Sequence, residues 1–147
     1  SVCTEIDNIK SLFSYRCRKE KVTLTSSCDT TIKIKGSSVR FNQCLSNIVS
    51  NALDAHTLSK RSHKTIGISV QKNPSDISIT ITDNANGIAP TTLNKIFNPF
   101  FTTKSIEKGT GIGLSMTKNI IEEAFRGTIS AKSTPKIGTT FTITLPT

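Results

Sequence analysis

The stretch DNANGIAPTTLNKIFNPFFTTKSIEKGTGIGLS, from Asp83 to Ser115, decides how the rest of the sequence is interpreted. It carries four of the eight glycines and, for most of its length, no regular apolar period. Loops of such length in a compact domain are usually either a functional lid or a disordered linker. The segments on both sides of the stretch have to distinguish these alternatives.

Apolar residues recur at helical spacing in three flanking segments. The predicted helices cover about residues 5–18, 38–56 and 114–125. A serine just before the second segment can act as its N-cap, and Gly127 is a candidate C-cap for the third.

Alternating apolar and polar residues predict six short strands in three pairs. They cover residues 21–27, 31–37, 64–73, 75–83, 127–133 and 139–146. These strands outnumber the crossover helices that a parallel sheet needs. We therefore predict one α+β domain over 1–147, a two-layer sandwich whose mixed sheet has its helices on one face.

Composition excludes several classes of protein. With 35% hydrophobic and 20% charged residues the chain is globular, and no apolar run approaches the roughly 18 residues that span a bilayer. The net charge is +9, but one tyrosine and no tryptophan make nucleic-acid binding a poor explanation. The basic cluster over 16–21 is either a solvated helix end or a surface for an acidic partner. Because the chain starts at Ser1, we expect a fragment of a longer protein.

The four cysteines contain no C-x-x-C pair, which argues against a zinc site. Cys17 and Cys44 lie in helical patterns, and the composition is that of an intracellular domain. We therefore expect all four cysteines, which include Cys3 and Cys28, to be free thiols.

Three polar residues share one face of the second predicted helix. Asn47, Asn51 and Asp54 follow the spacing i, i+4, i+7. The face is either simply the solvent side or a ligand site, and an amide oxygen is a suitable ligand for Mg²⁺.

The acid Asp83 ends a predicted strand, and Gly87 follows four residues later. Turn formation alone explains such an acid. The alternative is that its carboxylate accepts a hydrogen bond from a ligand N–H group, such as an exocyclic amine.

Two further patterns lie inside the long loop. Gly109, Gly111 and Gly113 directly precede a predicted helix, where backbone N–H groups can bind phosphate, although a hinge would also use glycine. The segment NPFFTTK (98–104) has two adjacent phenylalanines that must dock on the core, and its Lys104 is either exposed or near a phosphate.

Taken in order, these motifs resemble the ATP-binding catalytic domain of sensor histidine kinases, in the wider family shared with gyrase, Hsp90 and MutL. The similarity covers nearly all of residues 20–146. The matching segments are NIVSNALDA (N box, 47–55), DNANGI (G1 box, 83–88), IFNPFFTTK (F box, 96–104), GTGIGLS (G2 box, 109–115) and GTTFTITLP (138–146). The F box is typical of histidine kinases rather than of their ATPase relatives.

The resemblance implies the Bergerat (GHKL) fold, with residues 1–20 as a leading helix and 84–113 as a lid over ATP and Mg²⁺. It implies that Asn51 binds Mg²⁺ and that Asn47 lies near the phosphates, both as catalytic residues. The other implied nucleotide contacts are Asp83 to the adenine amine, Gly87 and Thr140 beside the base, and Lys104, Gly109, Gly111, Gly113 and Leu114 at the phosphates.

The resemblance also implies transfer of the γ-phosphoryl group of ATP to a histidine on a separate phosphoacceptor domain of the same protein, with a response regulator downstream. Neither that domain nor a sensor domain is present in the sequence, and a cytoplasmic location without membrane contact by this domain is implied; anchoring of a longer protein in the inner membrane stays open. His56 and His63 lack the acidic neighbour of a phosphoacceptor, so we expect both on the surface and no autophosphorylation.

Two alternatives remain. Hydrolysing relatives and the anti-sigma-type serine kinases share the fold, but Asn47 stands where the hydrolysing relatives have a glutamate as general base, and an amide cannot accept a proton at neutral pH. A degenerate nucleotide-binding module is the second alternative, because Ala85 replaces a common glycine of the G1 box.

Overall fold

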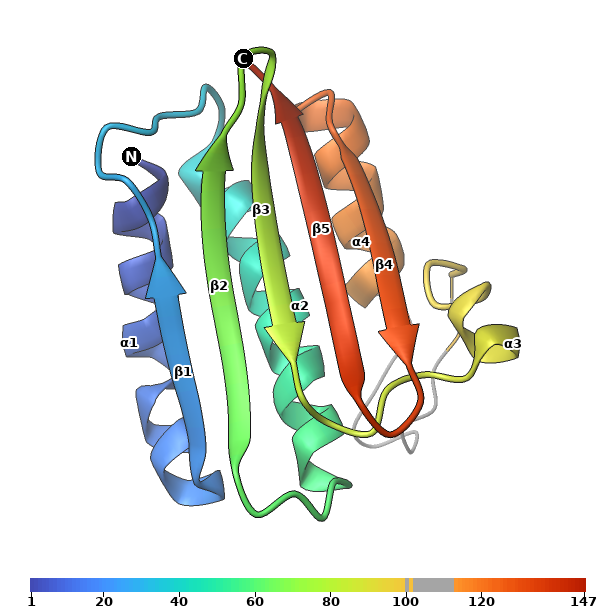
Figure 1. The fold of residues 1–147 in the computed structure, drawn as a ribbon. Coiled ribbons are helices and arrows are strands. Elements are labelled where there is room, and N and C mark those ends of the chain that lie inside the picture. The colour runs from blue at the N-terminus through green and yellow to red at the C-terminus, as the bar shows by residue number, and fades with distance from the viewer. Residues whose placement is uncertain (100, 102–112) are drawn as a thin grey trace.

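A mixed β-sheet forms one layer of the protein and helices form the other (Figure 1). The computed structural model describes residues 1–99, 101 and 113–147. In that part of the chain the sheet has five strands in the order β1-β2-β3-β5-β4. The strands are β1 (Val22–Ser27), β2 (Lys64–Lys72), β3 (Asp76–Asp83), β4 (Thr128–Thr134) and β5 (Gly138–Pro146).

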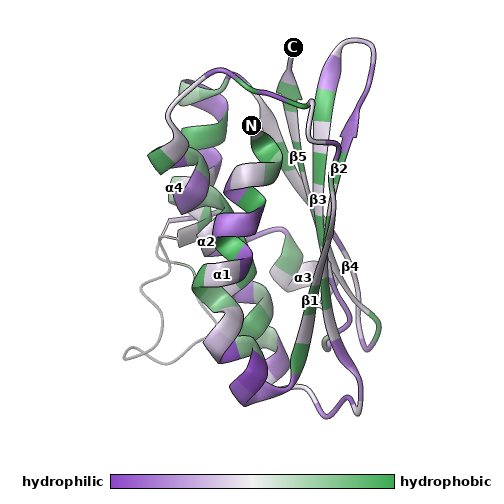
Figure 2. Cartoon of the chain, turned by 90° about the vertical axis from the view of Figure 1, so that its left-hand side faces the viewer, coloured by the Kyte–Doolittle hydropathy of each residue, from purple (hydrophilic) through white to green (hydrophobic). Residues whose placement is uncertain are grey.

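The helices cover a single face of this sheet, as the side view in Figure 2 shows. They are α1 (Val2–Glu20), α2 (Ser38–Thr57), the short α3 (Pro90–Leu93) and α4 (Gly113–Asn119), and a π-helical turn over Ile120–Ala124 directly follows α4. The Ser37 side chain caps α2 by accepting a hydrogen bond from the backbone N–H of Arg40 over 3.3 Å. The predicted two-layer α+β sandwich is confirmed.

Strand pairing explains why the sheet is mixed. β1 runs parallel to β2, with Val22 opposite Lys64, because α2 carries the chain back between them. The other three pairings are antiparallel. Alternation along each strand sends one set of side chains into the core, such as Ile77, Ile79 and Ile81 of β3, which are all buried beneath the helices.

The opposite face of the sheet carries mainly hydroxyl side chains. Most of the alternate residues of β3 and β5 on this face are serine and threonine, including Thr82 and Thr140, whose hydroxyl oxygens are 3.0 Å apart. No helix among the described elements covers this face (Figure 2).

The predicted strand over 31–37 is wrong. Asp29 forms a tight turn there: its side-chain Oδ1 accepts hydrogen bonds from the backbone N–H and the hydroxyl of Thr31, each over 2.8 Å. Ile32 is then buried beneath the start of α1, and its carbonyl oxygen accepts the backbone N–H of Val2 over 3.1 Å. The alternating pattern of this segment therefore serves a loop that holds α1.

The end of the third helix differs in detail from the prediction. Arg126, not Gly127, adopts the left-handed backbone conformation, with φ 54°. The backbone N–H of Gly127 donates to the Ile121 carbonyl over 2.8 Å, which ends the helix. A Cβ at Gly127 would lie 2.4 Å from the Thr144 carbonyl oxygen, so the glycine is needed for its close contact with β5.

The prediction of four free thiols is wrong for two of them. Cys3 and Cys28 form a disulfide with a Cα–Cα distance of 5.7 Å, between the first turn of α1 and the residue after β1. Cys17 and Cys44 are free and buried, as expected for cysteines on helices that face the core. Within the described ranges, no helix is both long and apolar enough to cross a membrane.

Candidate nucleotide site

The first group of candidate residues lies on α2, which faces α4 across the helical layer. Asn47 is half-buried, and its side-chain NH₂ donates to the Gly113 carbonyl over 3.2 Å and to the Thr117 hydroxyl over 3.1 Å. The Thr117 hydroxyl, itself buried, donates to the same Gly113 carbonyl over 2.8 Å. Asn47 therefore fixes the first turn of α4 against the middle of α2.

One helical turn further on, Asn51 is also half-buried. No hydrogen bond occupies its side-chain amide within residues 1–99, 101 and 113–147. Its oxygen is thus available to a ligand, whereas the NH₂ group of Asn47 is already bound to α4.

The third residue of this face, Asp54, has a different role. Its Oδ1 accepts a hydrogen bond from Arg16 Nη2 of α1 over 2.6 Å, and Arg16 Nε donates to Glu20 over 2.9 Å. Glu20 in turn accepts the Thr57 hydroxyl over 3.1 Å. Asp54 therefore joins α2 to α1.

Asp83 ends β3 at the edge of the sheet where α2 also ends (Figure 1). Its carboxylate is buried, with 6% of the residue exposed, and its Oδ1 accepts the backbone N–H of Ala85 over 3.0 Å. Burial raises the pKa of Asp83, while backbone hydrogen bonds from Ala85 and Thr139 and the nearby His56 act in the opposite direction. A desolvated carboxylate of this kind is a strong acceptor for a ligand N–H.

Ala85, the departure from the G1 pattern, fits without strain. It is fully buried, and the non-glycine residues with positive φ in the described chain are Lys21, Arg126 and Lys136. Positive φ occurs instead at Gly87, with φ 73°. A Cβ there would lie 2.2 Å from the Thr134 carbonyl oxygen, so only glycine fits this turn.

The turn between β4 and β5 packs directly on the loop after β3. The Ile88 backbone N–H donates to the Ser133 hydroxyl over 2.6 Å, and the Lys136 N–H donates to the Asn86 carbonyl. A Cβ at Gly138 would lie 2.1 Å from the Asp83 carbonyl oxygen. These contacts fix the backbone around the Asp83 carboxylate.

Two asparagines of the G1 segment hold the same loop from the other side. Asn84 accepts the Thr65 backbone N–H over 2.8 Å and donates to the His63 carbonyl over 2.7 Å. Asn86 donates to the Leu58 carbonyl over 3.2 Å. Both side chains therefore organise the loop.

His56 was expected on the surface, and this expectation is wrong. The ring is fully buried at the end of α2, and its Nε2 lies 2.9 Å from the Thr65 carbonyl oxygen, so Nε2–H is the donor. Its Nδ1 is buried and has no partner in the described structure. Position 56 is covered by the start of β2, which a helical pattern alone does not show. His63 is exposed, as expected.

The side chains of Thr140 and Asp83 lie on opposite faces of the sheet, although both residues line one groove. Asp83 pairs with Thr139 across β3 and β5, and Thr139 is buried on the same face of the sheet. Thr140 faces the open side, beside a groove of about 370 Å³. Asn47 and Asn51 do not line this groove. Its lining residues are Thr82, Asp83, Asn84, Lys132, Ser133, Thr134, Ile137, Gly138, Thr139 and Thr140. Thr139 is therefore an additional candidate residue beside Asp83, which the strand alternation together with the Asp83 register indicates.

Only part of the predicted lid can be placed. Gly113 begins α4, and Leu114 and Phe101 are partly buried against the core. Phe97 packs edge-on against Phe141 of β5, with ring centroids 6.3 Å apart. Lys104, Gly109 and Gly111 lie outside the described residues.

Known proteins resemble this chain in sequence and in fold. Residues 36–147 match the family model described as histidine kinase-, DNA gyrase B-, and HSP90-like ATPase. The chain is 37% identical over 138 residues to the sensor histidine kinase ZraS of Salmonella typhimurium, which covers 92% of this chain and 28% of ZraS. It is 37% identical over 116 residues to sporulation kinase A of Bacillus subtilis, which covers 79% of this chain and 18% of that kinase.

Solved structures give the same result. The catalytic domain of the histidine kinase ThkA matches with a TM-score of 0.84 and 26% identity, over 99% of this chain and 93% of that chain. The chain spans less than a third of the length of the curated relatives ZraS and sporulation kinase A. Because the family model covers most of the sequence, the chain belongs to the histidine kinase-, DNA gyrase B- and HSP90-like ATPase family.

Proposed function

We propose that this chain is the catalytic ATP-binding domain of a sensor histidine kinase, and that it transfers the γ-phosphoryl group of Mg-ATP to a histidine on a separate phosphoacceptor domain of the same protein. The observation that carries this proposal is the residue type at position 47 and the hydrogen bonds that its side chain makes. Asn47 is an amide, and its NH₂ group donates hydrogen bonds to Gly113 and Thr117.

A general base for water is therefore missing from this position. An amide cannot accept a proton at neutral pH, so Asn47 cannot activate water for hydrolysis. Phosphoryl transfer needs mainly positioning and charge neutralisation, which a nucleotide-binding domain supplies when the nucleophile comes from another domain. This favours transfer over fast hydrolysis.

ATP is the nucleotide of the family to which the chain belongs. We propose that the Asp83 carboxylate accepts the exocyclic amine of adenine and that Thr139, rather than Thr140, lies beside the base. Two observations support this proposal. Asp83 and Thr139 are both buried on the same face of the sheet, and only glycine fits the turn at Gly87. A guanine ring has a carbonyl where adenine has the amine, so its oxygen would face a carboxylate.

Mg²⁺ fits the donor chemistry on α2. The described residues contain no group of three or more histidine, cysteine, aspartate or glutamate side chains that could hold a metal. Mg²⁺ is commonly bound by one or two protein oxygens together with phosphates and waters. We propose that Asn51 supplies the protein oxygen, since its amide is available. When bound, Mg²⁺ would neutralise the phosphates.

We also propose contacts of the lid with the phosphates, a downstream partner and a location for the domain. Gly109, Gly111, Gly113, Leu114 and Lys104 would contact the phosphates from the lid. A downstream response regulator is proposed because a solved structure shows histidine kinase ThkA in complex with the response regulator TrrA. Because ATP is a cytoplasmic substrate, we also propose that the domain works in the cytoplasm.

The test uses radiolabelled γ-phosphoryl ATP with Mg²⁺ and the separately purified phosphoacceptor hairpin of ZraS. We expect acid-labile, base-stable label on the histidine of the hairpin, at a rate above phosphate release to water. Rapid phosphate release without labelled hairpin would indicate a stand-alone ATPase. Absence of Mg²⁺-dependent ATP binding in calorimetry would indicate a degenerate module.

A further inference from the structure

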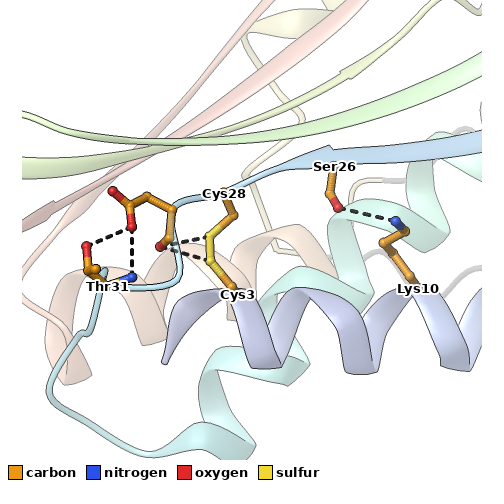
Figure 3. The surroundings of a disulfide bond; sticks show 6 residues. Cys3, Lys10, Ser26, Cys28 and Thr31 are labelled. Atoms are coloured by element: carbon orange, nitrogen blue, oxygen red, sulfur yellow. Dashed lines mark hydrogen bonds between the residues drawn. A yellow bond between two sulfur atoms is a disulfide. The ribbon is translucent and has the colours of Figure 1, made fainter.

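The disulfide between Cys3 and Cys28 joins two elements that the nucleotide site does not use. Cys3 lies in the first turn of α1, and Cys28 follows the last residue of β1 (Figure 3). Cys3 is 8% exposed, whereas Cys28 is partly exposed. A reagent in solution therefore reaches Cys28 first.

Other contacts hold the two cysteines together without the bond. The Val2 N–H donates to the Ile32 carbonyl over 3.1 Å, and Lys10 Nζ donates to the Ser26 hydroxyl over 3.3 Å, one at each side of the pair. Val2 and Ile32 are both buried in the core. Reduced thiols at these positions would consequently stay close to each other.

The turn at Asp29 also provides a hydrogen-bond acceptor for the two thiols of the reduced state. The Asp29 carbonyl oxygen lies 3.0 Å from Cys3 Sγ and 3.7 Å from Cys28 Sγ (Figure 3). In the disulfide neither sulfur has a proton, so these are simple contacts. In the dithiol either S–H can donate to this oxygen.

The other two cysteines provide a contrast. Burial raises the pKa of Cys44 to about 12, and burial also raises the pKa of Cys17. Thiol–disulfide exchange requires the thiolate. Both residues are therefore protected, and redox chemistry on this chain is confined to one pair.

We propose that Cys3 and Cys28 form a reversible redox-modification site whose oxidant is a low-molecular-weight disulfide of the glutathione type. The Cys28 thiolate attacks oxidised glutathione, forms a mixed disulfide and releases one glutathione thiolate. The Cys3 thiolate then attacks the Cys28 sulfur and releases the second. Two protein thiols are oxidised, one glutathione disulfide is reduced to two thiols, and the two protons pass to the leaving thiolates.

Reversibility rests on the proposed function. A domain that uses cytoplasmic ATP works where thiols are kept reduced, and disulfides formed there are mostly transient or redox-sensing. The bond would then fasten the first turn of α1 only under oxidising conditions. Since Asp83 and Asn51 make no contact with this pair, nucleotide binding is expected to be the same in both states.

The experiment equilibrates the purified chain in mixtures of reduced and oxidised glutathione, followed by acid quench, alkylation and peptide mass spectrometry. We expect the Cys3–Cys28 peptide to become half-formed within the glutathione range, with Cys17 and Cys44 alkylated only after unfolding. Oxidation should raise the melting temperature by on the order of 10 °C, because the bond closes a loop between residues 25 apart.

The matched control is the double variant S27C/C28S, which keeps the number of thiols but moves one of them to the exposed neighbouring position. It should form no intramolecular bond and show no redox shift of the melting temperature. The proposal is overturned if the wild-type pair never oxidises, if it bonds only between chains, or if glutathione never reduces it. ATP titration of both redox states reports separately on the proposed function.

Discussion

The Asn47 side chain donates to the carbonyl oxygen of Gly113 over 3.2 Å, so the helix that carries Asn51 is hydrogen-bonded to the first residue of α4. The same amide reaches the Thr117 hydroxyl over 3.1 Å. In N47A both donations are lost, although the Gly113 carbonyl keeps the Thr117 hydroxyl as a donor, and we expect a loss of about 1–2 kcal/mol in the free energy of unfolding. Urea melts measure this loss. The exposed variant N98A serves as control and should stay within about 0.5 kcal/mol of wild type.

Asn51 tests the metal site. In N51A the proposed protein oxygen for Mg²⁺ is removed, and we expect at least a tenfold loss of ATP affinity in the presence of Mg²⁺, or about 1.4 kcal/mol. Stability should change little, because this amide has no partner among the described residues. Calorimetry with Mg²⁺ and with EDTA separates the metal-dependent part. The neighbouring variant S50A is the control and should bind ATP as wild type does. If N51A also binds ATP with unchanged affinity, the assignment of Asn51 is contradicted.

Asp83 gives a pH-dependent prediction. Burial raises its pKa, so the folded state holds this proton more tightly than the unfolded chain does. The free energy of unfolding contributed by this group is then largest below the unfolded pKa and falls as pH rises through the folded value. Relative to D83N, which does not titrate, wild type should therefore lose stability as the pH rises above the ordinary aspartate pKa of about 4. If the free energy of unfolding of wild type instead rises relative to D83N as the pH increases, the prediction is contradicted.

The same substitution tests adenine recognition. D83N replaces the carboxylate with an amide that fits the same space, so the loop should persist while ATP binds more weakly. Competition between ATP and GTP measures the effect: wild type should prefer ATP, and D83N should lose most of that preference. Equal discrimination by both proteins would remove Asp83 from the site.

Gly87 and Gly67 form a matched pair of glycines. Alanine at Gly87 needs φ 73° and places a Cβ 2.2 Å from the Thr134 carbonyl, so we expect a loss of at least about 1–2 kcal/mol in unfolding free energy. Alanine at Gly67 meets only the Thr25 hydroxyl at 3.8 Å, and its φ is ordinary. G67A should be neutral or slightly stabilising. Thermal melts of the two variants provide the comparison.

The ion pair between Arg16 and Asp54 is expected to matter modestly. Both side chains are about one-third exposed, at 31% and 29%, so solvent screens the charges. A double-mutant cycle with R16M and D54N should give a coupling of about 0.5–1 kcal/mol. Arg18, on the exposed side of α1, provides the control cycle with Asp54 and should show no coupling.

The sequence predicted the layers of the fold well because its periods are local properties. The isoleucines of β3 and the long apolar face of α2 specify which side of each element is buried, and both predictions are confirmed. The segment 31–37 has the same alternation as a strand. There the Asp29 turn and the contact of Ile32 with Val2 decide the conformation, and neither is visible in a pattern of apolar residues.

Sequence motifs point to candidate site residues, but they do not show which residues tertiary pairing brings together. Thr139 and Thr140 are adjacent in sequence, and only the register opposite Asp83 shows which of them lies beside the carboxylate. His56 lies in the last turn of a helix, where a solvent-exposed residue is expected, but β2 covers it. Cys3 and Cys28 are brought together by the packing of α1 on β1, which their spacing along the chain does not reveal.

The parallel pairing of β1 with β2 has a consequence for how the chain folds. The hairpins β2–β3 and β4–β5 join strands that are close in sequence, so they can form within microseconds. Val22 can meet Lys64 only after the intervening α2 has formed and docked, so β1 is expected to join last. Until then β2 is an open sheet edge, and a newly made chain is most prone to aggregate through that strand.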